Sequence, residues 1–240
     1  MQWTIKGSAS EIDLRKPRGQ TKEMKMKSQT SNTAKKSPFV LFDLGGVLAD
    51  INVSAATQHW EKKTGTAASV WETQFFHSGL KEEMDKGRLS TADVVAKLGA
   101  STAMTLELFR EGWEKVLTVR PTMSDLVSQV SQKVPCGLLS NTDPIHHDWA
   151  NSHIPGLSDM SVQFVSYEEG CWKPEPKFYN QILSSLKQAP EEVFFVDDLQ
   201  RNVDAAQGAG MDAVLFTTEK ELRYQLSSRF IELEFLRMKL

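Results

Sequence analysis

Short, largely apolar runs recur along the chain. They are Phe39–Phe42, 137–140, 162–165, 193–197 and 213–216. Apolar runs without alternation are typical of strands buried on both faces, as in a parallel sheet. The stretches between them carry apolar residues at helical spacing. Because strands and helices alternate, we predict an α/β fold, a doubly wound parallel sheet formed by residues 38–50 and 119–240.

Three of the intervening stretches show clear helix signals. They are residues 123–130, which follow Pro121, residues 178–186, which follow Pro174 and Pro176, and residues 202–208, which Gly208 or Gly210 would close. Proline suits the first turn of a helix because its missing N–H would be unpaired there in any case. Glycine suits the residue after a helix because it adopts positive φ without strain.

Residues 51–118 break the alternation and show no convincing strand. Leu106, Phe109, Trp113 and Val116 lie on one helical face, and Ser90 to Asp93 resembles a capping box. The aromatic residues Trp60, Trp71, Phe75 and Phe76 are expected to form the segment's own core, although Trp60 and Asn52 could instead line a substrate pocket. We therefore predict a small all-helical cap domain over residues 51–118.

The first 37 residues carry nine Lys or Arg against three Asp or Glu, with few apolar side chains. Such a composition cannot bury enough apolar surface to offset the entropy of ordering, so a basic, disordered tail is expected. A solvated extension is the favoured interpretation, and contact with nucleic acid, an anionic membrane or an acidic partner is the alternative.

Composition excludes several classes of protein. A net charge of −3 over 240 residues argues against nucleic-acid binding outside the basic tail. Cys136 and Cys171 form no metal-binding pair, which favours a reducing, cytoplasmic setting. Neither a membrane span nor a signal peptide is predicted. We expect a monomer or homodimer that acts on a small molecule.

Polar residues stand where the apolar runs end. Asp43 follows the first run, Ser140 and Asn141 the second, and Asp197 and Asp198 the fourth. In an open parallel sheet, ligands bind outside the carboxyl ends of the strands, so these side chains are expected on one rim. Lys173 lies shortly after the third run and should reach the same rim.

This set of residues suits phosphoryl transfer. Asp43 can attack phosphorus, and crowded carboxylates with only oxygen ligands favour Mg²⁺. Ser140 can donate to a phosphoryl oxygen, and Lys173 can neutralise both Asp43 and the phosphate. Gly45 and Gly46 allow backbone amides to approach the anion closely.

Four motifs in order resemble those of the haloacid dehalogenase superfamily. They are FVLFDLGGVLAD from Phe39, LSNT from Leu139, KPEP from Lys173 and FVDDLQRN from Phe195. The position of the helical insert resembles the subfamily with a cap between the first and second motifs, which includes sugar-phosphate phosphatases and haloacid dehalogenases.

The resemblance implies a role for each residue at the rim. Asp43 would be the nucleophile and a metal ligand, and Lys173 would hold the phosphate beside it. Asp198 and the carbonyl of Gly45 would bind Mg²⁺ with support from Asp197. Phosphate contacts would come from Ser140 and Asn141. Apart from the resemblance, the backbone of Gly46 is expected to approach the phosphate, and Asn202, about one helical turn after Asp198, is expected to brace the metal site.

One position departs from the family pattern. Phosphatases of the family usually carry a second aspartate, an acid/base, where this chain has Gly45. Its loss typically costs about 10²–10⁴ in rate. A magnesium-dependent phosphatase for a small phosphomonoester, such as a sugar phosphate, is the leading hypothesis. The alternatives are a dehalogenase, for which Arg110 or Arg120 would hold the halide, and a catalytically weak binding protein. His146 and His147 are interpreted as helix-start residues.

Overall fold

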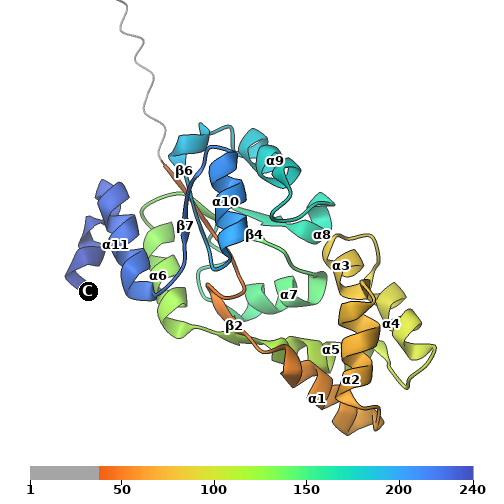
Figure 1. The fold of residues 1–240 in the computed structure, drawn as a ribbon. Helices are drawn as coiled ribbons and strands as arrows, with labels where there is room; N and C mark the ends of the chain where they lie inside the picture. Colours follow the sequence, from red (N-terminus) through yellow and green to blue (C-terminus); the bar gives the residue numbers. More distant parts are fainter. Residues whose placement is uncertain (1–37, 240) are drawn as a thin grey trace, which may run out of the picture. The chain divides into compact units, whose positions relative to one another are not determined.

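The computed structural model describes residues 38–239, so the predicted tail of residues 1–37 lies outside the described residues. A five-stranded parallel sheet forms the centre, in the order β5-β4-β1-β6-β7 (Figure 1). Its strands are β1 (Phe39–Phe42), β4 (Cys136–Ser140), β5 (Val162–Val165), β6 (Val193–Asp197) and β7 (Asp212–Leu215). The strands lie where the apolar runs predicted them, and β7 alone ends one residue early.

Both faces of the sheet are covered, which explains why the strands lack alternation. Along β1, Val40 and Phe42 pack into one apolar cluster, while Phe39 and Leu41 pack into the cluster on the opposite face. A side chain of this kind contributes about 1.5–3 kcal/mol when it is fully buried. Because successive side chains alternate between the faces, a strand covered on both sides needs apolar residues at every position.

Helices of the α/β part cover these two faces. The cluster around Val40 takes side chains from α6 (Pro121–Ser131), α7 (Pro144–His153) and α11 (Glu219–Arg229). The cluster around Leu41 takes side chains from α9 (Pro176–Leu186) and α10 (Gln200–Gly208). The short helix α8 (Ser166–Glu169) follows β5, and the chain ends in a 3₁₀ segment, Ile231–Lys239. The doubly wound fold is thus confirmed.

A run of helices separates β1 from β4. It contains α1 (Val53–Thr64), α2 (Ala68–Trp71), a π-helical turn (Glu72–His77), α3 (Leu80–Asp85), α4 (Thr91–Gly99) and α5 (Leu106–Trp113). A 3₁₀ turn, Glu114–Val116, follows α5. The predicted capping box at the start of α4 is present, since Ser90 and Asp93 bond to each other's backbone N–H groups.

Aromatic side chains form the core of this helical segment. Trp60 is fully buried, stacks on Phe109 with ring centroids 5.2 Å apart, and donates from Nε1 to the carbonyl of Leu108. Trp71 and Phe75 pack edge-on against Trp60. The prediction of an aromatic core is therefore confirmed, and the alternative that Trp60 lines a substrate pocket is wrong. Its indole is buried where no substrate could touch it.

The structure contains two short strands that the sequence did not predict. β2 (Ala49–Ile51) and β3 (Leu117–Val119) pair antiparallel, with Asp50 opposite Thr118. Three residues are too few to show a period of two, so the pattern carried no signal. The pair joins the two ends of the helical segment at the point where the chain leaves and re-enters the α/β part. A cap with boundaries at 51 and 118 stays a prediction.

Polar contacts tie the helical segment to α7 and α8 beside it (Figure 1). The indole of Trp113 donates to Oδ2 of Asp143 at 2.8 Å, and a ring nitrogen of His146 lies 2.8 Å from the carbonyl of Trp113. The hydroxyl of Ser166 donates to the carbonyl of Asp85 at 2.6 Å. Among residues 38–239, no helix combines the length and the apolar character that crossing a bilayer requires.

Candidate active site

The polar residues at the strand ends come together as predicted. Carboxylate oxygens of Asp43, Asp197 and Asp198 all lie within 4.8 Å of one another. Asp43 follows β1, while Asp197 ends the neighbouring strand β6 and Asp198 follows it. Parallel pairing of β1 with β6 brings these ends to one edge of the sheet, because both strands run in the same direction.

Lys173 lies at the centre of this cluster. Its side chain is only 1% exposed, and Nζ lies 2.8 Å from Oδ1 of Asp43 and 2.7 Å from Oδ2 of Asp197. Nζ also donates to the carbonyl of Leu139 at 3.0 Å. Three acceptors match the three protons of an ammonium group. The lysine is therefore held rigidly between the two carboxylates.

Asn141 fixes the backbone that carries Lys173. Its Nδ2 donates to the carbonyl of Lys173 at 2.7 Å, and its Oδ1 accepts from the N–H of Lys173 at 2.8 Å. These two bonds connect the side-chain amide of Asn141 to the loop of Lys173, and the contact of Asn141 with phosphate stays a prediction. Ser140 is buried at the end of β4, where it pairs with Val165.

The pKa values of the two aspartates that contact Lys173 shift in opposite directions. Burial raises the pKa of Asp43 to about 8, although the nearby Lys173 opposes this. Burial also disfavours the charge on Asp197, but Lys173, the N–H of Leu199 and the amide of Asn202 outweigh it and lower the pKa. Without further positive charge, the site therefore holds one carboxylate firmly ionised and the other readily protonated.

Hydrogen bonding leaves Asp198 the most open of the three carboxylates. Asp197 accepts from Nζ of Lys173, from the N–H of Leu199 at 2.9 Å and from Nδ2 of Asn202 at 2.9 Å. Asp198 is half-buried, and burial together with the charge of Asp197 raises its pKa. A divalent cation would relieve this crowding, and an all-oxygen set suits Mg²⁺. The donor set therefore fits the predicted ion.

The turn after Asp43 contains the two glycines. The N–H of Gly46 donates to the carbonyl of Ala49 at 2.8 Å, and the N–H groups of Leu48 and Ala49 donate to the carbonyl of Leu44. These bonds use neither the N–H nor the carbonyl of Gly45. The backbone of Gly45 is therefore the better placed of the two for a ligand, whereas the N–H of Gly46, predicted to face phosphate, is already paired.

Close contacts surround both glycines. A Cβ on Gly46, whose φ is +76°, would lie 2.1 Å from Oδ2 of Asp198. A Cβ on Gly45 would lie 2.5 Å from Cδ1 of Ile51. Real Cβ atoms do not approach neighbours this closely, so any larger residue would have to displace them. The side chain of Ile51 thus fills the space beside Gly45 that a side chain at this position would need.

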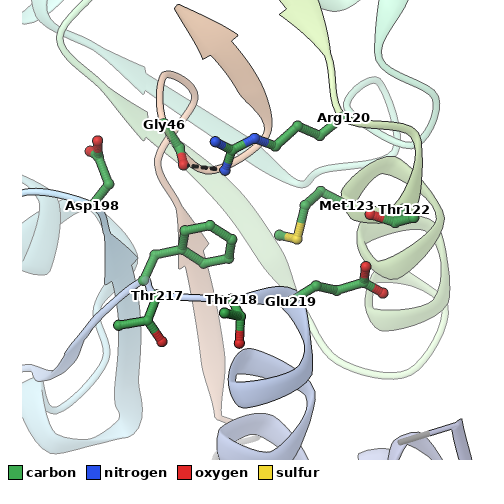
Figure 2. A pocket seen from close by; sticks show the side chains of 9 residues that line it. Gly46, Arg120, Thr122, Met123, Asp198, Thr217, Thr218 and Glu219 are labelled. Atoms are coloured by element: carbon green, nitrogen blue, oxygen red, sulfur yellow. Dashed lines mark hydrogen bonds between the residues drawn. The ribbon is translucent and has the colours of Figure 1, made fainter.

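Arg120 is a residue of this region whose contacts the sequence did not reveal. It donates from Nη1 to the carbonyl of Gly46, as Figure 2 shows, and from Nε to Oδ1 of Asp50 at 2.6 Å. It borders a cavity of about 480 Å³ that also reaches Asp198 and Glu219. The partners lie more than 60 residues away in the chain, so no local pattern could indicate them.

The two histidines near the second motif have structural partners. His146 lies in the first turn of α7 and also approaches Asp143 with Nδ1, at 3.2 Å. His147 binds the hydroxyl of Tyr167 at 2.9 Å and Oε1 of Gln163. These contacts agree with their interpretation as helix-start residues.

Relatives among characterised proteins include two phosphatases. The chain is 26% identical over 182 residues to D-ribitol-5-phosphate phosphatase from Bacteroides thetaiotaomicron, covering 72% of this chain and 88% of that protein. It is 29% identical to a sesquiterpene phosphatase from Aspergillus oryzae, covering 71% of this chain and 85% of the relative.

Solved structures show the same fold. A haloacid dehalogenase-family enzyme from Bacteroides thetaiotaomicron superposes with a TM-score of 0.71 at 22% identity, covering 80% of this chain and 99% of that one. Its complex with magnesium and inorganic phosphate superposes with a TM-score of 0.69 at 23% identity, covering 77% of this chain and 96% of that one. A family model for haloacid dehalogenase-like hydrolases matches residues 39–210. The protein therefore belongs to the haloacid dehalogenase-like hydrolases.

Proposed function

We propose that the protein is a magnesium-dependent phosphatase that hydrolyses a small phosphomonoester through an aspartyl-phosphate on Asp43. The observation that carries this proposal is the contact of Asp43 with the buried ammonium of Lys173, beside two further carboxylates at the same sheet edge. Two relatives named as phosphatases, and a neighbouring structure with magnesium and phosphate, support it.

The oxygen atoms of Asp43 have distinct environments. Oδ1 accepts from Nζ of Lys173 at 2.8 Å and from the N–H of Leu44 at 2.7 Å. We therefore assign the attack to Oδ2. A bond forms from Oδ2 to phosphorus, the bond from phosphorus to the leaving oxygen breaks, and that oxygen takes a proton from water. A water oxygen then bonds to phosphorus, the bond from phosphorus to Oδ2 breaks, and the proton of that water passes to the solvent, which releases inorganic phosphate and restores the carboxylate of Asp43.

The carboxylates of Asp43 and Asp198 and the carbonyl of Gly45 would hold Mg²⁺, with Asp197 acting through Lys173. Bound Mg²⁺ neutralises charge on the carboxylates and on the phosphate. Lys173 also supplies positive charge to Asp43 and so opposes the rise in its pKa that burial causes. Ser140 is proposed to contact the phosphate. The helical segment would close over the substrate as a cap and exclude water.

The leaving-group side of the site is apolar at position 45. Phosphatases of the family usually carry an acid there, whereas the space beside Gly45 is occupied by Ile51, which is 54% exposed. We propose that good substrates release an oxygen acidic enough to leave without a proton from the enzyme. An anomeric sugar phosphate and an aryl phosphate both meet this condition.

The dehalogenase alternative has weaker support. Arg120 binds Asp50 and the carbonyl of Gly46, and Arg110 pairs with Glu114 at 3.4 Å, so both arginines already have acidic partners. A halide site would have to compete with these carboxylates for the same guanidinium groups.

Phosphate release from a panel of phosphomonoesters with Mg²⁺ tests the proposal. We expect activity on sugar phosphates and p-nitrophenyl phosphate that EDTA abolishes. Asp43→Asn should lose at least about 10³-fold in rate, because the nucleophile is removed. Asp125→Asn, at an exposed position on α6, is the matched control and should match the wild type. Release by Asp43→Asn at the wild-type rate would contradict the proposal.

A further inference from the structure

Arg120 connects three segments that lie far apart in the sequence. Its guanidinium donates to the carbonyl of Gly46, binds Oδ1 of Asp50 through Nε and Nη2, each at 2.6 Å, and lies 5.5 Å from the ring centre of Phe216. In Figure 2 the side chain of Arg120 extends to Gly46, and Asp198 is drawn on the other side of that glycine. The planar fork of arginine suits several acceptors at once, whereas lysine offers a single point of charge.

The arginine stands at the junction between the helical segment and the α/β part. It directly follows β3, and its N–H donates to the carbonyl of Leu48 at 3.1 Å. Its partner Asp50 is in β2, the strand through which the chain leaves the α/β part. Arg120 therefore clamps the outgoing and returning strands to the turn that follows the nucleophile.

The turn that contains Gly46 packs against the carboxylate of Asp198. A Cβ on Gly46 would lie within 2.9 Å of all three carboxylate atoms of Asp198, so the carboxylate packs directly on the glycine's Cα. A shift of the Gly46 peptide group would therefore move the carboxylate or change its distance from Asp43. The carbonyl of the same peptide group is the one that Arg120 holds.

We propose that Arg120 is a positioning residue for the metal centre. By binding the carbonyl of Gly46, it fixes the peptide against which Asp198 packs, and so sets the separation at which Asp43 and Asp198 can share one Mg²⁺ ion. The ion pair with Asp50 holds the guanidinium of Arg120 in place. The inference rests on the proposed function, because it takes Mg²⁺ to bind between these carboxylates.

The alternative role for Arg120 is a surface ion pair that only stabilises the fold. Its side chain is 29% exposed and that of Asp50 is 59% exposed. Pairs this exposed usually contribute about 0–1 kcal/mol to stability. Groups that orient metal ligands, in contrast, typically change metal affinity by about 10–100-fold when they are removed. Stability and Mg²⁺ affinity therefore separate the two roles.

Isothermal titration of the full chain with Mg²⁺ alone tests the proposal. For Arg120→Met we expect Mg²⁺ affinity to fall by about 10-fold or more. Arg120→Lys should fall nearly as far, because one ammonium cannot reach both acceptors, and Asp50→Asn should lose less, because the bond to Gly46 remains. Arg110→Met removes an exposed arginine paired with Glu114 and is the matched control. Its affinity should equal that of the wild type.

Two further measurements separate positioning from folding. The melting temperature of Arg120→Met should stay within a few degrees of the wild type, and its kcat should recover at saturating Mg²⁺, because only metal binding is weakened. Gly46→Ala keeps the arginine but inserts a Cβ against Asp198, and it should lose Mg²⁺ affinity as well. Mg²⁺ affinity within twofold of the wild type in folded Arg120→Met and Arg120→Lys would overturn the inference alone. A wild type that binds no Mg²⁺ would overturn the proposed function with it.

Discussion

Replacement of Lys173 by methionine should reveal how the carboxylates are held together. The ammonium is 1% exposed and contacts Asp43 at 2.8 Å, Asp197 at 2.7 Å and the carbonyl of Leu139 at 3.0 Å. Methionine keeps much of the volume but leaves two buried carboxylates without a counter-charge. Removal of one partner from a buried ion pair costs about 3–5 kcal/mol.

The loss can be measured by thermal unfolding in EDTA. For a domain of 150–250 residues, each kcal/mol changes the melting temperature by about 2–4 °C, so Lys173→Met should melt roughly 6–20 °C lower. Lys97→Met, on an exposed face of α4, is the control and should stay within about 0.5 kcal/mol of the wild type.

Addition of Mg²⁺ extends the same experiment. A ligand at 100 times its Kd stabilises the folded state by about 2.7 kcal/mol. The ion should raise the melting temperature of Lys173→Met more than that of the wild type, because it supplies the positive charge that the lysine no longer provides. A variant that melts within about 2 °C of the wild type in EDTA would refute the view that Lys173 holds Asp43 and Asp197 together.

Three further predictions follow from particular contacts. Gly45→Asp should lose less than about 1 kcal/mol of stability, because the exposed Ile51 side chain can turn away from the new Cβ, and it should hydrolyse alkyl phosphates faster than the wild type. Burial raises the pKa of Asp85 above 3.8, so its folded state favours the proton. The stability of the wild type relative to Asp85→Asn should therefore fall as pH rises from about 4. Trp113→Phe should cost about 1–3 kcal/mol, because Asp143 loses a buried donor.

Each of these predictions has a measurement that would contradict it. Denaturant titration would contradict the first if Gly45→Asp lost more than about 2 kcal/mol of stability, as would unchanged hydrolysis of alkyl phosphates. A difference in stability between the wild type and Asp85→Asn that stayed constant from pH 4 to pH 7 would exclude a raised pKa for this aspartate. An unchanged unfolding midpoint for Trp113→Phe would show that the bond to Asp143 contributes nothing.

The sequence by itself determined the architecture of the α/β part. Strands buried on both faces need apolar residues at every position, so runs such as Phe39–Phe42 identify them directly. Chain direction then places the polar residues that end β1 and β6 at one edge of the sheet. The proximity of Asp43, Lys173, Asp197 and Asp198 could be predicted for this reason, since it follows from topology rather than from side-chain detail.

Only the tertiary structure decided which polar groups of the site already have partners within the protein. The amide of Asn141 binds the backbone of Lys173, and the N–H of Gly46 closes its own turn. The side chain of Ile51 fills the space beside Gly45, and the carbonyl of Gly46 accepts a hydrogen bond from Arg120. Contacts of this kind depend on the direction of single side chains.

The reason is physical. Periodicity reports the face on which a residue lies, because burial of that face repeats every turn of a helix or every second residue of a strand. It carries no information about a partner such as Gly46, which lies 74 residues before Arg120. That partner is fixed only when β2 and β3 pair and bring the two segments together, and strands of three residues leave no period in the sequence to predict it.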